Sequence, residues 1–310
     1  MKKNFVIGVD IGGTRVRMGC VDATYRLQNT RMAFCSTLFG TENTVGAVCD
    51  VLKNYIRDFK GKSDILGISI GVPSTLSRDR KTIISTPNIP GLDNIRLGEI
   101  VEKELGLSTI LERDVNFLLY NDIERLKLDT SGTVIGCYVG TGFGNAVMVE
   151  GNLLIGKNGT ACELGHIPVP GNAERCSCGN FGCVETIASG RKLSELRDAY
   201  LPGAEMCEMF LKHYPTCGFL RDFIDYLSIP VATEINIFDP DYVILGGGVL
   251  AMPGFPTGDF ENSIRRHVRK PAPEKELEIV YASDDIYNGV RGAGIYGFKK
   301  LMARTKKEEE

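Results

Sequence analysis

Long hydrophobic runs are missing from this 310-residue chain. No stretch reaches the roughly 18 apolar residues that a membrane-spanning helix requires, so no membrane partner is expected. The first apolar run, Phe5 to Val9, is shorter than the roughly 7 to 15 apolar residues of a secretory leader. We therefore expect a cytoplasmic protein.

An excess of positive charge is missing as well. The chain carries 36 Lys and Arg against 39 Asp and Glu, a net charge of −3, with a pI near 5.8. Without an excess of positive charge the protein does not attract the phosphates of nucleic acids, so no nucleic acid partner is expected.

Cysteine, by contrast, is frequent, with ten residues. In a cytoplasmic protein they indicate free thiols or metal ligands rather than disulfides.

Glycine is the residue in clear excess, with 36 of 310 residues, about 12%, against roughly 7% in average proteins. No G-X-Y period is present, which excludes collagen. The hydrophobic fraction of 43% and the charged fraction of 24% exclude a low-complexity linker. The chain can bury a large core, and its length favours two domains.

Strand-like and helix-like segments alternate, which is typical of α/β proteins. Residues 5–21 and 133–149 each read as a strand, a glycine turn and a return strand, which is a hairpin signal. The repeated layout predicts an internally duplicated fold. Further strands are expected at 65–72, 108–111, 242–245 and 277–282. Helices are expected at 44–59, 95–105, 115–127 (crossing between the halves), 223–238 and 288–302.

Three glycine loops stand at the ends of expected strands. Glycines let the backbone approach a ligand closely, and successive exposed amides form an anion-binding nest. A carboxylate at the strand end before the first loop is placed to hold hydrated Mg²⁺ near phosphates. The alternatives are plain hairpin turns for the first two loops and a hinge for the third. The residues concerned are Asp10, Gly12, Gly13, Thr14 and Arg15; Gly140, Thr141, Gly142 and Gly144; and Gly246, Gly247 and Gly248.

These loops resemble the two phosphate motifs and the adenosine motif of the actin, hexokinase and heat-shock ATPase superfamily. The resemblance implies an α/β fold of two duplicated, ribonuclease-H-like lobes, with ATP and Mg²⁺ bound in the cleft between them. The smaller lobe is expected to comprise residues 1–117 and 290–310, the last segment being a closing helix. The larger lobe is expected to comprise residues 118–289.

A second pattern gathers one of only three histidines and three cysteines within a short stretch. His166, Cys176, Cys178 and Cys183 form a Cys₃His set, which suits tetrahedral Zn²⁺. Four protein ligands close the site, so the zinc is expected to be structural. The alternative is a set of reduced thiols without metal. The other seven cysteines lack such spacing, and most of them are expected to be small buried apolar residues.

The pattern Glu163-Leu164-Gly165-His166 followed by Cys-x-Cys-Gly-x-x-Gly-Cys-x-Glu resembles the signature of the ROK family, which comprises sugar kinases and sugar-responsive repressors. The resemblance covers essentially the whole chain. It implies that Glu163, His166 and Glu185 contact sugar hydroxyls, with zinc holding their loop, and it suggests a homodimer.

Transfer of a phosphoryl group to a sugar hydroxyl needs a carboxylate to accept the proton. Asp114 follows an expected strand and can be such a base or a helix N-cap, and spacing alone does not separate the two. The segment resembles the family's Asn-Asp-x-Asn motif, which implies that Asp114 is the base. Arg113 stands where glucose kinases of the family usually have Asn. The resemblance also implies that Asn88, Arg113 and Asp114 contact the sugar.

Within the family, segments 83–88, 113–116 and 279–284 look most like those of D-allose kinases. The expected function is ATP-dependent phosphorylation of an aldohexose at its 6-hydroxyl, with D-allose favoured. A glucokinase or a kinase for another hexose or N-acyl hexosamine is the alternative within that class. A repressor would need a DNA-reading helix, for which the hairpin beginning at Phe5 leaves no room. A zinc-ribbon binding module would not need two phosphate hairpins.

Overall fold

The structure is a computed structural model that describes residues 4–38, 43–59, 65–86 and 89–309. The chain forms two compact units. The first comprises Met1–Lys127, Ile155–Ala161 and Asp285–Glu310, and the second comprises Leu128–Leu154 and Cys162–Asp284. None of the helices formed by the described residues combines the length and the hydropathy of a membrane span.

The first unit is built on a five-stranded sheet in the order β3-β2-β1-β4-β7. Strands β1, β2 and β3 are antiparallel neighbours, whereas β4 and β7 run parallel to β1. The strands are β1 (Phe5–Ile11), β2 (Arg15–Asp22), β3 (Leu27–Phe34), β4 (Ile65–Val72) and β7 (Thr109–Arg113), with a small separate pair, β5 (Thr75–Leu76) and β6 (Ile83–Ser85).

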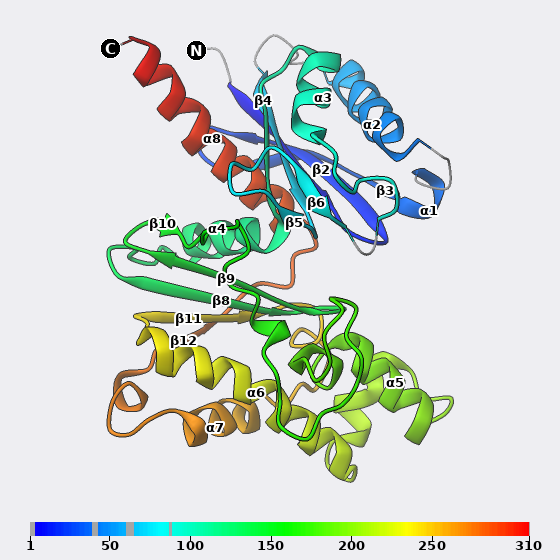
Figure 1. Cartoon of the computed structure of the whole chain (residues 1–310), viewed down its shortest axis with the longest axis vertical. Helices are drawn as coiled ribbons and strands as arrows, with labels where there is room; N and C mark the ends of the chain where they lie inside the picture. The colour runs from blue at the N-terminus through cyan, green and yellow to red at the C-terminus, as the bar shows by residue number, and fades with distance from the viewer. Residues whose placement is uncertain (1–3, 39–42, 60–64, 87–88, 310) are drawn as a thin grey trace. The chain divides into compact units, whose positions relative to one another are not determined.

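Helices cover both faces of this sheet (Figure 1). The alternate side chains Ile7 and Val9 of β1 pack with α2 (Thr44–Asp58) and α3 (Leu97–Leu105). The opposite face meets α8 (Asn288–Glu309), and α8 in turn packs on α4 (Asp114–Leu126). A short helix, α1 (Cys35–Leu38), follows β3.

Four glycines explain how α8 comes so close to its neighbours. A Cβ on Gly292 would lie 1.8 Å from the Phe117 oxygen of α4, and one on Gly294 or Gly297 would clash with β2 or β1. A Cβ on Gly8 of β1 would likewise lie 2.0 Å from the Val290 oxygen. Part of the glycine excess therefore serves packing between helix and sheet rather than ligand binding.

The second unit repeats the same sheet, in the order β10-β9-β8-β11-β12. Strands β8 (Thr133–Val139), β9 (Phe143–Val149) and β10 (Asn152–Leu153) are antiparallel, and β11 (Tyr242–Gly246) and β12 (Ile279–Tyr281) run parallel to β8. In both units the first three strands form a meander and the next two add in parallel beside the first. The predicted duplicated α/β fold is thereby confirmed.

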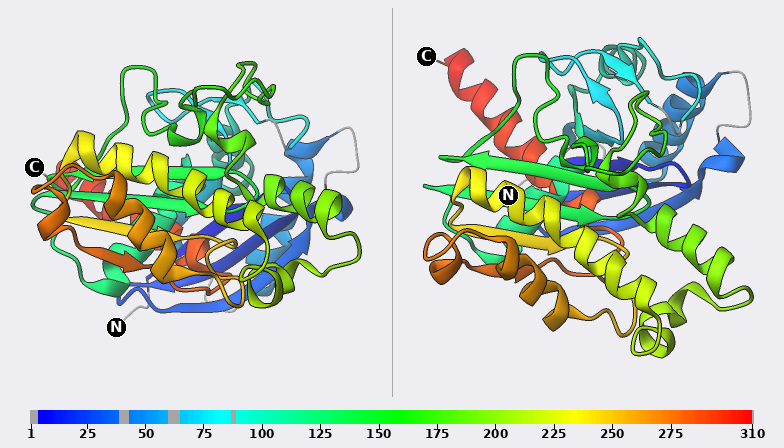
Figure 2. Two further views of the ribbon diagram at one scale, coloured as in Figure 1. Left: turned by 90° about the horizontal axis from the view of Figure 1, so that it is seen from below. Right: turned by 60° about the horizontal axis from the view of Figure 1, so that its bottom comes forward.

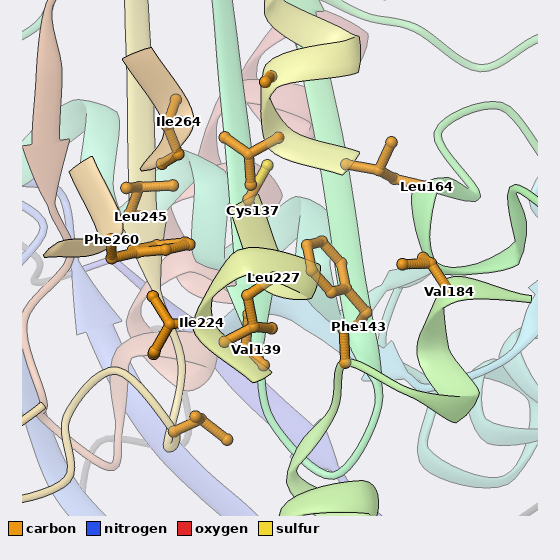
Figure 3. Close-up of a cluster of buried hydrophobic side chains, with 14 of the residues drawn as sticks. Cys137, Val139, Phe143, Leu164, Val184, Ile224, Leu227, Leu245, Phe260 and Ile264 are labelled. Atoms are coloured by element: carbon orange, nitrogen blue, oxygen red, sulfur yellow. The ribbon is translucent and has the colours of Figure 1, made fainter. Parts of the chain in front are cut away.

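One face of the second sheet is covered by α6 (Gly218–Phe238) and α7 (Thr257–His267), which lie side by side in Figures 1 and 2. Their apolar side chains, such as Leu227 and Phe260, belong to the same buried cluster as those of β8 and β11, such as Val139 and Leu245 (Figure 3). The unit also contains α5 (Gly190–Tyr200) and short helical turns at Leu164–His166, Val184–Thr186, Met206–Glu208, Met209–His213 and Glu274–Glu276.

The structure corrects several sequence-based boundaries. The 115–127 helix, expected to cross between halves, lies wholly in the first unit because it packs on α8. The expected boundary after residue 117 therefore falls inside α4. The glycine turn at 140–144 is shorter than expected, since Gly144 lies within β9 and pairs with Tyr138. The strand expected at 277–282 is only Ile279–Tyr281.

A carboxyl group lies buried in the second unit. Glu234 of α6 is only 4% exposed, and its Oε2 accepts a hydrogen bond from Asn145 Nδ2 at 2.8 Å. Burial raises the pKa of Glu234 from 4.5 to about 7. The folded state therefore binds a proton that the unfolded state releases above about pH 4.5, so stability falls as the pH rises through 7.

Replacing Glu234 with glutamine is expected to stabilise the protein at pH 8 by about 3 kcal/mol, the cost of ionising this carboxyl in the folded state. At pH 5 the gain should fall to about 1 kcal/mol, because Glu234 is then neutral in the folded state and only the unfolded state remains largely ionised. Thermal unfolding of both proteins at the two pH values measures the difference, with the exposed Glu205→Gln as control. An equal effect at both pH values would contradict the assignment.

Candidate functional site

The first glycine loop joins β1 to β2 and is tied to the chain that follows β3. The Gly12 amide donates to the Arg15 carbonyl at 2.9 Å, and the Cys35 amide donates to the Thr14 carbonyl at 2.8 Å. Cys35 Sγ also donates to the Gly12 carbonyl at 3.1 Å. Gly13 and Thr14 at the tip are exposed. The loop is thus held at its base while its tip stays open to solvent.

Asp10 lies near the end of β1, opposite Arg17 in the β1–β2 register. Arg17 Nη1 donates to Asp10 Oδ2 at 3.2 Å, and the Asp10 side chain is 16% exposed. A Cβ on Gly289, at the start of α8, would lie 3.0 Å from Asp10 Cγ. The carboxylate therefore stands beside the positive end of a long helix dipole.

Asp10 and Asp114 come together within the first unit. Burial and the nearby Asp114 carboxylate raise the pKa of Asp10 from 3.8 to about 6, while Arg17 opposes the shift. Two neighbouring carboxylates favour a bound divalent cation, whereas Arg17 and the positive end of α8 oppose it. Asp10 lies near the end of β1 and Asp114 directly follows β7, and the parallel order of β1, β4 and β7 brings these strand ends to one edge.

Asp114 is the first residue of α4, directly after β7, as predicted. The N-cap position belongs to Arg113, whose backbone is extended and whose side chain makes no capping hydrogen bond. Asp114 Oδ1 accepts a hydrogen bond from the Val115 amide at 2.8 Å. The carboxylate thus accepts a hydrogen bond from one amide of the first turn without being the cap.

Two residues before Asp114 stands Glu112, whose side chain is completely buried. Arg80 Nε lies 3.0 Å from its Oε1, and the Arg113 amide and Asn116 Nδ2 both donate to Oε1 at 2.9 Å. The Tyr296 hydroxyl donates to Oε2 at 3.4 Å. No motif in the sequence marks this group, because its members come from three separate parts of the chain, namely Arg80, the stretch 112–116 and Tyr296.

The Arg113 side chain reaches a backbone carbonyl. Its Nη1 donates to the Ala161 oxygen at 2.9 Å, so the guanidinium is fixed beside the segment 155–161. Asn88, the other sequence-predicted sugar contact in this unit, lies outside the described residues.

In the second unit the predicted metal ligands converge. The ligand atoms of His166, Cys176, Cys178 and Cys183 all lie within 4.8 Å of one another. Cys176 Sγ is 3.5 Å from His166 Nδ1, and Cys178 Sγ is 3.6 Å from Cys183 Sγ. Tetrahedral zinc with bonds of about 2.3 Å to sulfur separates two sulfurs by roughly 3.8 Å. The donor set and its spacing therefore fit one Zn²⁺.

The turns that carry Glu163, His166 and Glu185 are anchored by apolar neighbours. Leu164, in the turn Leu164–His166, and Val184, in the turn Val184–Thr186, are buried in the core beside Phe143 (Figure 3). The two ring nitrogens of His166 have different neighbours. Nδ1 lies beside Cys176 Sγ, whereas Nε2 lies 3.8 Å from Glu163 Oε2. The histidine can thus hold a metal through one nitrogen and face a ligand with the other.

Glu185 joins this cluster to the second glycine loop. Its Oε2 accepts a hydrogen bond from the Phe143 amide at 2.9 Å, and a Cβ on Gly142 would lie 2.4 Å from that oxygen. The Gly140 amide donates to the Gly142 carbonyl, and the Arg191 amide donates to the Thr141 carbonyl, both at 3.0 Å. The structure therefore brings a predicted sugar-binding group and a predicted phosphate loop into contact.

A protein-family model described as "ROK family" matches residues 6–297. The chain belongs to the ROK family.

Known ROK proteins and related kinases are similar over nearly the whole chain. A glucokinase of Thermotoga maritima is 29% identical over 272 residues, which cover 80% of this chain and 83% of the relative. An N-acetyl-D-glucosamine kinase of Escherichia coli O157:H7 is 25% identical over 301 residues, 92% of this chain and 97% of the relative. A similar solved structure is that of a ROK family glucokinase from Streptomyces griseus in complex with glucose and AMPPNP. It superposes with a TM-score of 0.78 at 26% identity, and the match covers 94% of this chain and 98% of that one.

The third glycine loop of this ROK protein has a packing role that the sequence did not indicate. Gly247 has a φ of +98°, and a Cβ there would lie 2.4 Å from the Val139 carbonyl oxygen. A Cβ on Gly246 would clash with Ala282. By contrast, a Cβ on Gly248 would meet no described atom within 4 Å. Of the three glycines, Gly248 is therefore the one whose surroundings leave space for a ligand.

Proposed function

We propose that this ROK protein is an ATP-dependent hexose kinase that phosphorylates the 6-hydroxyl of an aldohexose. The observation that supports the proposal is the approach of Asp10 to Asp114, because one carboxylate at the β1–β2 hairpin then lies near another at the start of α4. Phosphoryl transfer to an alcohol needs both kinds of group. The glucokinase and N-acetylglucosamine kinase relatives support the same class of reaction.

In the proposed mechanism Asp114 accepts the proton of the 6-hydroxyl as that oxygen attacks the γ-phosphate in line. Asp10 would hold Mg²⁺, which supplies charge neutralisation at the phosphates. The amides at Gly12–Thr14 and Gly140–Gly142 would bind phosphate oxygens, and Gly246–Gly248 would lie at the adenosine. Glu163, His166 and Glu185 would bind the sugar hydroxyls, and a zinc bound by His166 and the three cysteines would keep their turns rigid.

For the sugar we propose D-allose, with a glucokinase or an N-acyl hexosamine kinase as the alternative. Arg113 replaces the Asn that glucose kinases of the family usually carry before the base, and allose differs from glucose only at C3. An altered contact beside Asp114 suits that difference. We further propose that the enzyme is a homodimer, which sedimentation analysis of the purified protein would test.

The substrate proposal is tested by coupled ADP-release assays with D-allose, glucose, mannose, N-acetylglucosamine and N-acetylmannosamine. The highest kcat/KM is expected for allose. A higher value for glucose or an N-acyl hexosamine would reassign the sugar without removing the kinase.

Replacing Arg113 with asparagine is expected to shift the ratio of kcat/KM for allose over glucose at least 10-fold towards glucose. The change removes a guanidinium fixed at the Ala161 carbonyl and supplies an amide that can bind ring hydroxyls. The matched control is Arg78→Met, which removes an exposed arginine of the same unit. An unchanged ratio would exclude Arg113 from sugar discrimination.

When Mg²⁺ is subsaturating, kcat/KM is expected to fall as the pH is lowered through about 6. Asp10 must be ionised to hold the cation, and its raised pKa of about 6 means that protonation begins just below neutrality. Because Arg17 lowers this pKa, Arg17→Met should move the limb of kcat/KM to higher pH. A limb that stays in place, or moves to lower pH, would show that Asp10 does not control it.

A further inference from the structure

Glu112 is hydrogen-bonded to the residues at the start of α4. Its Oε1 accepts hydrogen bonds from the Arg113 amide and from Asn116 Nδ2, one on each side of Asp114 in the chain. These hydrogen bonds fix the first turn of α4 only if the buried Glu112 carboxylate is itself held in one orientation. The group that neutralises it is therefore central to the geometry at Asp114.

That group is Arg80, whose side chain is 13% exposed. Its Nε lies 3.0 Å from Glu112 Oε1, and its Nη1 donates to the Gly159 carbonyl at 2.8 Å. Arg80 stands in the turn between β5 and β6, with a φ of +58°. The turn is organised by Ser77, which accepts a hydrogen bond from the Thr82 amide and donates to Asp79. A backbone conformation that favours glycine is thus occupied by an arginine whose side chain makes two internal contacts.

The carbonyl that Arg80 contacts belongs to the segment 155–161, which we call the strap. The strap is part of the first unit although the chain on both sides of it belongs to the second. Gly159 is buried, and a Cβ there would lie 2.5 Å from the Leu76 oxygen. Arg113 binds the strap at Ala161, two residues before Glu163. Two arginines that contact Glu112, Arg80 by its side chain and Arg113 by its amide, therefore also bind the strap.

We propose that Arg80 is a positioning residue for sugar binding, which acts by fixing Glu112 and the strap together. Through Glu112 it orients Arg113 and Asp114, and through Gly159 it orders the backbone that leads to Glu163. This role rests on the proposed sugar kinase activity, and it concerns recognition of the sugar rather than of ATP, because each group that Arg80 fixes leads to a residue proposed to bind sugar.

Arg80→Met is expected to raise the KM for the sugar at least 10-fold while the KM for ATP changes less than twofold. Arg78→Met, two residues away on the same turn and exposed, is the matched control and should change neither constant. Equal increases in both KM values, or no change in either, would overturn the positioning role.

A charge-balanced variant separates positioning from stability. Loss of Arg80 alone leaves a buried charge, whereas Arg80→Met with Glu112→Gln removes both charges and should restore the unfolding temperature. The sugar KM is expected to remain raised in this double variant, because the strap still lacks its anchor. Recovery of the wild-type sugar KM would show that only charge balance mattered.

Trypsin cleavage gives a readout that needs no enzymatic activity. Lys157 lies exposed within the strap, and cleavage after it divides the chain into two fragments of nearly equal length. Cleavage at Lys157, mapped by mass spectrometry, is expected to be at least 10-fold faster in Arg80→Met than in Arg78→Met. Equal rates would contradict docking of the strap by Arg80. If the wild type phosphorylates no sugar, the proposed function fails while this measurement still decides the strap.

Discussion

Asp114→Asn is expected to lower kcat by at least about 100-fold while the dissociation constant for the sugar changes less than about threefold. The amide keeps an oxygen that can accept the hydrogen bond from the Val115 amide, so the first turn of α4 should persist. It cannot accept the proton of the attacking hydroxyl. Steady-state turnover and calorimetric sugar binding measure the two effects separately.

The control for this substitution is Asp129→Asn, which changes an exposed aspartate of a loop. It should leave both quantities unaltered. Near-wild-type turnover of Asp114→Asn would remove Asp114 from the role of base. Loss of sugar binding together with turnover would instead indicate that Asp114 mainly shapes the sugar site.

Cys178→Ser is expected to reduce bound zinc from one ion per chain to a small fraction of that value. Cys178 supplies one of four ligand atoms that lie within 4.8 Å of one another, and a hydroxyl is a much weaker ligand than a thiolate. Metal analysis of freshly purified protein gives the stoichiometry. The sugar KM should rise at least 10-fold, since the turn that carries Glu163 and His166 loses its anchor.

Cys207→Ser is the matched control, because Cys207 is also exposed and lies outside the Cys₃His cluster. It should retain one zinc per chain and the wild-type sugar KM. Wild-type protein without zinc would contradict the metal site. Loss of zinc from both variants would show that general damage, rather than loss of a ligand, releases the metal.

Elements with strong apolar patterns could be predicted from the sequence. Strand β4 has the expected bounds, 65–72, because its residues are almost all buried and form one apolar run. The ligand cluster could be predicted because its four side chains lie close together in the chain, where spacing alone restricts the geometry.

Other elements depend on neighbours that the sequence does not reveal. Strand β3, Leu27–Phe34, was missed because most of its side chains are exposed and only pairing with β2 makes it a strand. Helix α5 buries Leu193 alone and therefore shows no apolar face to recognise.

The positioning groups are hidden for a similar reason. Arg80 and Glu112 meet only after β5, β6 and β7 have folded together, and an isolated Arg or Glu in a sequence is most often exposed. The buried carboxyl of Glu234 is equally invisible, since its partner Asn145 comes from a distant strand. Polar pairs between residues far apart in the sequence can be recognised only in the structure.

Incubation of the purified protein with MgATP and D-allose, with the products followed by phosphorus NMR, shows whether this chain is a hexose 6-kinase. We expect one phosphomonoester, coupled to the protons on carbon 6, formed in equal amount to ADP and absent with Asp114→Asn. No phosphomonoester with allose or with any other hexose, or a phosphate on another carbon, would contradict it.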